Sequence, residues 1–165
     1  MGRRRADERN GFELPQHLRM ENFKEDLFAM TKMGNVGTSG FSKYTLNLFD
    51  MAFTWEDLQW LIEISTIPII LKGVMRADDA VRALEYGVAG IVVSNHGGRQ
   101  LDHCAATIEV LPEIVKAVNK RCPIFIDGGF RSGADIFKAI ALGADAVLIG
   151  RPIIYGLTIA VIIII

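Results

Sequence analysis

One stretch decides the fold of this chain: Ala89-Gly90-Ile91-Val92-Val93-Ser94-Asn95-His96-Gly97-Gly98-Arg99-Gln100. Its first part is a short apolar run typical of a buried strand, and its second part is polar. A buried strand that ends this abruptly delivers polar side chains to the carboxyl edge of a sheet, where parallel α/β folds carry their active sites. His96 can exchange a proton near neutral pH, and Arg99 can bind a carboxylate with two hydrogen bonds. We therefore predict a catalytic site here rather than a surface loop.

Segments with strand and helix patterns alternate on both sides of this stretch. Short apolar runs predict strands over residues 68–72, 89–94, 123–127 and 145–150. Apolar residues at helical spacing predict three helices between them, and a further helix is expected to begin at Thr54, with Asp57 completing its cap. In the last of the three helices, Ile136, Phe137 and Ile140 are expected to face the core. Continuously apolar strands joined by helices indicate a parallel sheet covered on both faces.

Four strand–helix units are compatible with half of an eight-stranded barrel or with a small open sheet. The ends of the last two predicted strands favour the barrel, because phosphate sites in such barrels lie after strands seven and eight. Each end combines glycine amides with an arginine, the groups that bind a phosphate dianion. The two segments are Asp127-Gly128-Gly129-Phe130-Arg131 and Gly150-Arg151. Either one alone is also compatible with a tight turn beside a surface arginine.

Lys72 ends the first of these predicted strands. A lysine at a strand end is often only a solvated charge. At the mouth of a barrel the same cation faces the bound ligand, so both interpretations of Lys72 stay open at this point.

Composition excludes several functional classes. The chain has 165 residues with a formal net charge of −1, which argues against nucleic acid or an anionic membrane as the main partner. Cys104 and Cys122 fit no zinc spacing, and no metal site is expected. The charged start of the chain argues against a secretory signal, and no window has the apolar length of a membrane span. Residues 1–53 mix charges and glycines in a pattern typical of a long irregular segment.

The stretch from Ser94 to Gln100, with Leu101 and Asp102, resembles the active-site signature of the FMN-dependent α-hydroxy-acid oxidases and dehydrogenases, the glycolate oxidase family. This resemblance implies a parallel (β/α) barrel of the TIM type. Residues 1–157 resemble only the second half of that domain, strands five to eight, preceded by the irregular segment. Residues 158–165 depart from the family as an apolar tail. The resemblance also implies that the Asp which orients the catalytic His belongs to the other half of the domain.

The resemblance further implies a set of roles around a bound FMN. His96 is similar to the family's catalytic base. Arg99 and Arg4 match the arginines that hold the substrate carboxylate, with Arg3 the alternative to Arg4. The residues that match flavin contacts are Lys72 and Ser94 beside the ring, and Asp127, Gly128, Gly129, Phe130, Arg131, Gly150 and Arg151 around the ribityl chain and phosphate.

The activity implied is oxidation of a small L-2-hydroxy acid to a 2-keto acid. Oxygen is the expected electron acceptor, giving hydrogen peroxide as in the oxidases, and another acceptor, as in the dehydrogenases, stays open. A homo-oligomer and an intracellular, peroxisomal location are implied in the same way, although the chain ends in Ile165 and carries no peroxisomal C-terminal signal. Two alternatives remain from the sequence. One is a non-catalytic fragment that binds FMN or phosphate, or pairs with another chain. The other is a different phosphate-binding barrel enzyme, which the His96 signature disfavours.

Overall fold

The computed structural model describes residues 9, 17, 50 and 52–159. The chain divides into two units, Met1–Phe53 and Thr54–Ile165, and the elements below belong to the second unit. Arg4 and almost all of the irregular segment expected over residues 1–53 lie outside the described residues, as do residues 160–165 of the expected apolar tail.

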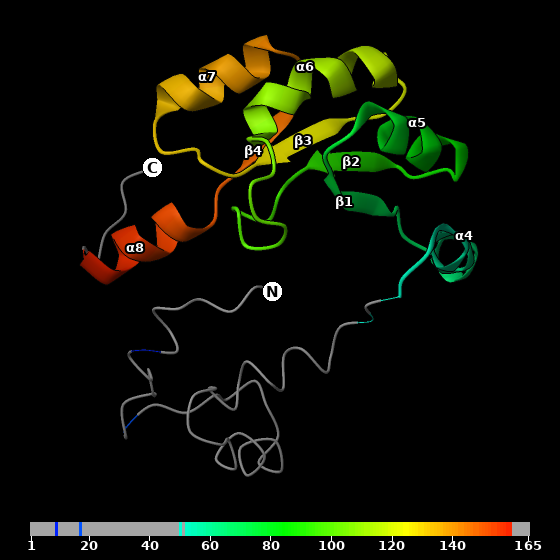
Figure 1. The fold of residues 1–165 in the computed structure, drawn as a ribbon, viewed down its shortest axis with the longest axis horizontal. Coiled ribbons are helices and arrows are strands. Elements are labelled where there is room, and N and C mark those ends of the chain that lie inside the picture. The colour runs from blue at the N-terminus through cyan, green and yellow to red at the C-terminus, as the bar shows by residue number, and fades with distance from the viewer. Residues whose placement is uncertain (1–8, 10–16, 18–49, 51, 160–165) are drawn as a thin grey trace. The chain divides into compact units, whose positions relative to one another are not determined.

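Within the described residues a parallel sheet has the strand order β1-β2-β3-β4 (Figure 1). The strands are β1 (Ile70–Val74), β2 (Gly90–Val93), β3 (Ile124–Asp127) and β4 (Ala146–Leu148). Lys72 pairs with Val92, and Val92 pairs with Phe125, so these residues lie on one face of the sheet. The predicted series of consecutive parallel strands is confirmed, with no strand end displaced by more than two residues.

Helices follow the strands in the expected alternation. The described helices are α4 (Trp55–Ile64), α5 (Ala77–Glu85), α6 (Thr107–Val118), α7 (Gly133–Ala141) and α8 (Arg151–Ile159). Helices α5, α6 and α7 cover the same face of the sheet (Figure 1). The boundary expected between residues 157 and 158 falls inside α8, which continues to Ile159. None of the helices between residues 52 and 159 has the length and apolar content of a membrane-spanning segment.

The helix starts follow from local sequence. The Thr54 side chain accepts a hydrogen bond from the Asp57 amide, and the Asp57 carboxylate accepts one from the Thr54 amide, so the capping box predicted for α4 is confirmed. Ser132 and Asp135 form the same arrangement at the start of α7. Each reciprocal pair satisfies backbone donors that have no partner inside the helix.

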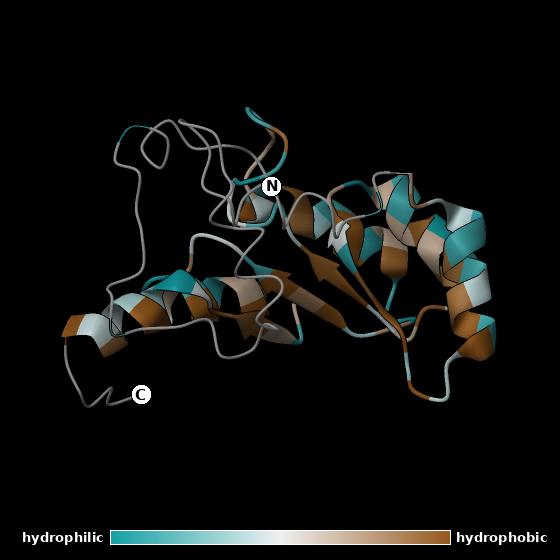
Figure 2. Cartoon of the chain, turned by 90° about the horizontal axis from the view of Figure 1, so that it is seen from below, coloured by the Kyte–Doolittle hydropathy of each residue, from teal (hydrophilic) through white to brown (hydrophobic). Residues whose placement is uncertain are grey.

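The core lies between the sheet and its helices. The largest fully buried apolar side chains are Ile91, Val93, Leu111, Ile114, Val118 and Ile126. Figure 2 shows strands that are mostly hydrophobic and helices that carry both hydrophobic and hydrophilic residues. Because Ile91 and Val93 of β2 are both fully buried in this core, the strand that leads to His96 is firmly anchored.

Two expectations about this core are wrong. Helices cover only one face of the described sheet, and Ile70 and Leu148 on the opposite face are exposed. A barrel fills that inner face with side chains from its other strands, and these four strands supply one side. Phe137 and Ile140 do not face the core but are 74% and 45% exposed. The buried residue on α7 is Ala139, because each helical step rotates a side chain by about 100°.

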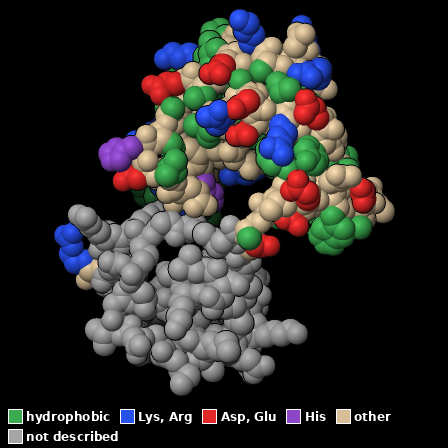
Figure 3. Space-filling view, turned by 45° about the vertical axis from the view of Figure 1, so that its right-hand side comes forward, with side chains coloured by type: hydrophobic (Ala, Val, Ile, Leu, Met, Phe, Trp, Pro, Cys, Tyr) green, Lys and Arg blue, Asp and Glu red, His purple; other side chains and the backbone are tan. Residues whose placement is uncertain are grey.

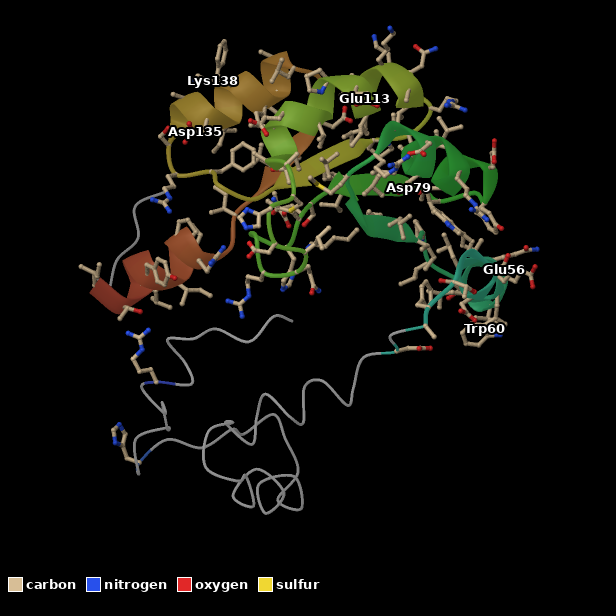
Figure 4. The ribbon with its side chains drawn as sticks, viewed as in Figure 1. Glu56, Trp60, Asp79, Glu113, Asp135 and Lys138 are labelled. Atoms are coloured by element: carbon tan, nitrogen blue, oxygen red, sulfur yellow. The ribbon has the colours of Figure 1, made fainter. Side chains whose placement is uncertain are left out.

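Several large apolar side chains are exposed among the described residues. One of them is Trp60, which projects from α4 away from β1 (Figure 4). On the face drawn in Figure 3, basic and acidic side chains are interspersed over the described residues. Charge on that face therefore does not single out a surface for a polyanion.

Candidate active site

Three neighbouring strands bring their polar ends together around Lys72. Its ammonium group donates a hydrogen bond to Ser94 Oγ at 3.0 Å, and it lies 3.3 Å from Asp127 Oδ2. Lys72 comes from β1, Ser94 follows β2 and Asp127 ends β3. The predicted gathering of polar side chains at the carboxyl end of the sheet is confirmed for Lys72, Ser94 and Asp127, and their functional roles stay predictions. The cation is therefore held by partners within the site and is not only a solvated charge.

His96 stands on a tight turn that directly follows β2. Its φ of +56°, with +65° at Gly97 and +70° at Gly98, makes three successive residues left-handed. A non-glycine residue in that region costs about 1–2 kcal/mol. Ser94 Oγ offsets the strain by accepting a hydrogen bond from the His96 amide at 3.1 Å. Asn95 closes the turn, because its Oδ1 accepts from the Gly98 amide at 3.0 Å.

The surroundings of His96 favour a neutral imidazole. Burial lowers its pKa first, and the nearby charge of Lys72 lowers the pKa further, while Asp127 acts in the opposite direction. A folded-state pKa below the unfolded value means that the unfolded chain binds the proton more readily. The contribution of His96 to stability is therefore present at neutral pH and is lost as the pH falls through the folded-state pKa. A neutral imidazole at pH 7 can accept a proton from a substrate.

We expect Lys72→Met to raise the pKa of His96, because the substitution removes a cation and leaves the Asp127 carboxylate unpaired. The measurement is a pH titration of the His96 ring signals by NMR. Lys116→Met, a loss of the same charge on an exposed position of α6, is the matched control and should leave the titration unchanged. A His96 pKa that stays the same or falls in Lys72→Met would contradict the assigned electrostatics.

Asp127 has an unused acceptor. Among the described residues its Oδ1 is the buried side-chain oxygen or nitrogen that lacks a hydrogen-bond partner. Its other oxygen pairs with Lys72. Because a buried acceptor without a donor is costly, this oxygen is suited to a hydroxyl group brought by a ligand.

The predicted phosphate segments lie at the ends of β3 and β4. Gly128 and Gly129 have φ values of +93° and +83°, and the buried Phe130 anchors the segment that follows them. A Cβ added to Gly129 or to Gly150 would meet nothing within 4 Å, so space beside both is open.

The two arginines of these segments have different surroundings. Arg131 is exposed, and its guanidinium makes no hydrogen bond to another described residue. Arg151 donates from Nη2 to the Gly97 carbonyl oxygen at 2.7 Å, which joins the end of β4 to the His96 turn. Arg99, partly buried, lies in the loop that follows this turn.

The sequence did not predict the contacts of two residues of the site, although Asn95 belongs to the signature. Asn95 closes the His96 turn, and Thr107 donates a hydrogen bond to the Asp127 carbonyl oxygen at 2.6 Å. Both act through backbone groups that a residue pattern does not reveal. Residues 52–159 contain no cluster of His, Cys, Asp or Glu suited to a metal ion.

Residues 1–161 match the model of the family described as FMN-dependent dehydrogenase. The chain is 51% identical over 158 residues to 2-hydroxyacid oxidase 1 of Mus musculus, covering 95% of this chain and 43% of the relative. It is 52% identical over 157 residues to the peroxisomal (S)-2-hydroxyacid oxidase GLO3 of Arabidopsis thaliana, covering 95% and 42%.

A crystal structure of mandelate oxidase with (S)-4-hydroxymandelic acid superposes with a TM-score of 0.84 at 46% identity, covering 97% of this chain and 44% of that one. The chain thus spans less than half the length of the relatives it matches. The likeness confirms that the four strands are part of an α/β barrel rather than a small open sheet.

Proposed function

The chain belongs to the FMN-dependent dehydrogenase family, and on this premise we propose that it serves FMN-dependent oxidation of an L-2-hydroxy acid to a 2-keto acid. The observation that carries the proposal is the placement of Lys72. Its ammonium group, shared between Ser94 and Asp127, lies at the same sheet end as the His96 turn. A fixed cation at this point stabilises negative charge on a reduced flavin ring.

The residues present fit the parts of FMN. Lys72 and Ser94 would lie against the ring, and the unpaired Oδ1 of Asp127 would accept from a ribityl hydroxyl. The open backbone at Gly129 and Gly150 would admit the phosphate, with Arg131 and Arg151 supplying positive charge. Gly128 and Phe130 would shape the segment between them.

His96, Arg99 and Arg4 would act on the substrate. Arg99 and Arg4 would hold the substrate carboxylate, although Arg4 lies outside the described residues. When bound, FMN supplies an acceptor for two electrons. The C–H and O–H bonds of the hydroxy acid would break as a C=O bond forms. The imidazole of His96 would take one proton, and the two electrons with the second proton would pass to FMN. The lowered pKa of His96 keeps its imidazole neutral and able to accept that proton.

We extend the proposal to the remaining steps of the cycle. Oxygen would accept the two electrons and become hydrogen peroxide. A peroxisomal location is proposed because one relative is named as peroxisomal. A homo-oligomeric assembly is proposed from the resemblance of the sequence to the family. Expression of a tagged chain and sizing of the purified protein would test the location and the assembly.

The test of the cofactor assignment is a titration of the purified chain with FMN, followed by flavin fluorescence. We expect Arg131→Ala and Arg151→Ala each to weaken binding by about tenfold or more, because a hydrogen bond to a charged group contributes roughly 1.5–3 kcal/mol. His96→Ala should change the affinity little, since the imidazole acts on substrate and not on phosphate.

Lys138→Ala is the matched control for loss of a positive charge. Lys138 lies on the exposed side of α7, the helix that follows Arg131 (Figure 4). Equal losses of affinity in Arg151→Ala, His96→Ala and Lys138→Ala would count against a specific phosphate site.

A further inference from the structure

Thr107 is one of two buried polar side chains among the described residues; the other is Ser94, and each is 2% exposed. Both lie at the candidate active site. Ser94 joins Lys72 to the His96 turn, as described above. The buried hydroxyl of Thr107 likewise links two elements of the fold.

The Thr107 hydroxyl joins α6 to the end of β3. Its Oγ1 donates to the Asp127 carbonyl oxygen at 2.6 Å, with the Gly128 carbonyl oxygen farther away at 3.5 Å. The Asp127 carbonyl and the Gly128 amide belong to one planar peptide unit and point in opposite directions. A side chain that fixes the carbonyl therefore also fixes the direction in which the Gly128 N–H donates.

Gly128 is enclosed on the side of the catalytic loop. A Cβ added there would lie 3.4 Å from Asn95 Oδ1 and 3.5 Å from Thr107 Oγ1. Asn95 itself bonds both ends of the loop between β2 and α6, accepting from the Gly98 amide and donating to the Ala105 carbonyl at 3.2 Å. The loop that carries His96 and the segment that follows β3 thus meet at Gly128. The side chains of Asn95 and Thr107 both lie beside this glycine.

We propose that Thr107 is a positioning residue that fixes the Asp127–Gly129 backbone for cofactor binding and holds it in register with the His96 loop. This inference rests on the proposed function. Thr107 would touch neither flavin nor substrate, because its hydroxyl proton is used on the Asp127 carbonyl. Its effect reaches the cofactor through the Gly128 amide and the side chain of Asp127.

The decisive variant is Thr107→Val, which keeps the shape of the side chain and removes the donor. We expect it to weaken FMN binding by about tenfold, because it removes the hydroxyl that donates to the Asp127 carbonyl and so loosens the peptide unit between Asp127 and Gly128. Thr107→Ser keeps the hydroxyl and should bind within about threefold of the unchanged chain. Ile114→Val is the stability control, since Ile114 is fully buried and lies about two helical turns beyond Thr107 on α6. It should lower the denaturation midpoint and leave FMN affinity unchanged.

A second measurement does not depend on FMN. In the unliganded chain, Thr107→Val should shift the NMR amide signals of Gly128 and Gly129 and speed their hydrogen exchange, whereas Thr107→Ser and Ile114→Val should not. If the unchanged chain binds no FMN, the proposed function fails, and these amide signals alone decide the role of Thr107. Unaltered signals in Thr107→Val, or affinity lost equally in Thr107→Val and Ile114→Val, would overturn the proposal. Should Thr107→Val not fold, Thr107→Ala replaces it in both measurements.

Discussion

Gly143→Ala will destabilise the folded unit by about 3 kcal/mol. Gly143 follows the end of α7 with a φ of +106°, a conformation that costs a residue with a Cβ about 1–2 kcal/mol. The new Cβ would also lie 2.7 Å from Cγ1 of Val115 on α6, and overpacking of this kind costs about 1–3 kcal/mol more. Urea denaturation followed by circular dichroism should show a lower midpoint with an unchanged slope.

Two further variants separate the backbone strain at Gly143 from the overpacking against Val115. Gly133→Ala is the control, because a Cβ there meets nothing within 4 Å and Gly133 opens α7 without a positive φ. It should be neutral or stabilise by up to about 1 kcal/mol. Val115→Ala removes the methyl groups that the new Cβ would strike, so the double variant should recover the packing part of the loss and keep the backbone part. A Gly143→Ala protein as stable as Gly133→Ala would contradict this account of the α6–α7 contact.

The order of strands and helices, and the meeting of the site side chains at one edge of the sheet, could be predicted because both depend on local sequence patterns. Apolar runs ended by polar residues placed the strands, and parallel strands must end at a common edge. Lys72, Ser94 and Asp127 were therefore expected to lie together, and their contacts at 3.0 and 3.3 Å confirm it. Lys72 alone was ambiguous in the sequence, because nothing local distinguishes a solvated lysine from one that pairs across two strands.

The features that the sequence could not provide depend on partners distant in the chain. Phe137 and Ile140 are apolar at helical spacing, but which side of α7 faces the sheet is settled by its packing against β4, and on that packed side Ala139 is buried. The role of Thr107 requires a carbonyl twenty residues away. The left-handed φ of His96 is held by Ser94 Oγ, a backbone contact that residue types alone do not indicate.

The 165-residue chain, assayed by itself, should oxidise 2-hydroxy acids more slowly than its full-length relatives by about 10⁴ or more. No carboxylate of residues 52–159 hydrogen-bonds the His96 imidazole, although Asp127 acts on it at longer range. In a serine-protease triad, a catalytic imidazole that loses its orienting acid loses about 10⁴ in rate. The exposed inner face of the sheet, where Ile70 and Leu148 lie, adds to this loss, because an open sheet leaves a substrate at its carboxyl end less fully enclosed and positioned.

The measurement is oxidation of glycolate, lactate and a longer 2-hydroxy acid with added FMN, first with the chain alone and then with a separately expressed first half of a relative's barrel. We expect activity only in the mixture, because the added strands would cover the inner face and supply the acid that orients His96. His96→Ala should abolish the recovered activity, whereas Lys138→Ala, on the outer side of α7, should retain it. Full activity from the chain alone would refute the prediction. A mixture that assembles and stays inactive would instead favour a binding role without catalysis, because His96 would then have its enclosure and still not act on substrate.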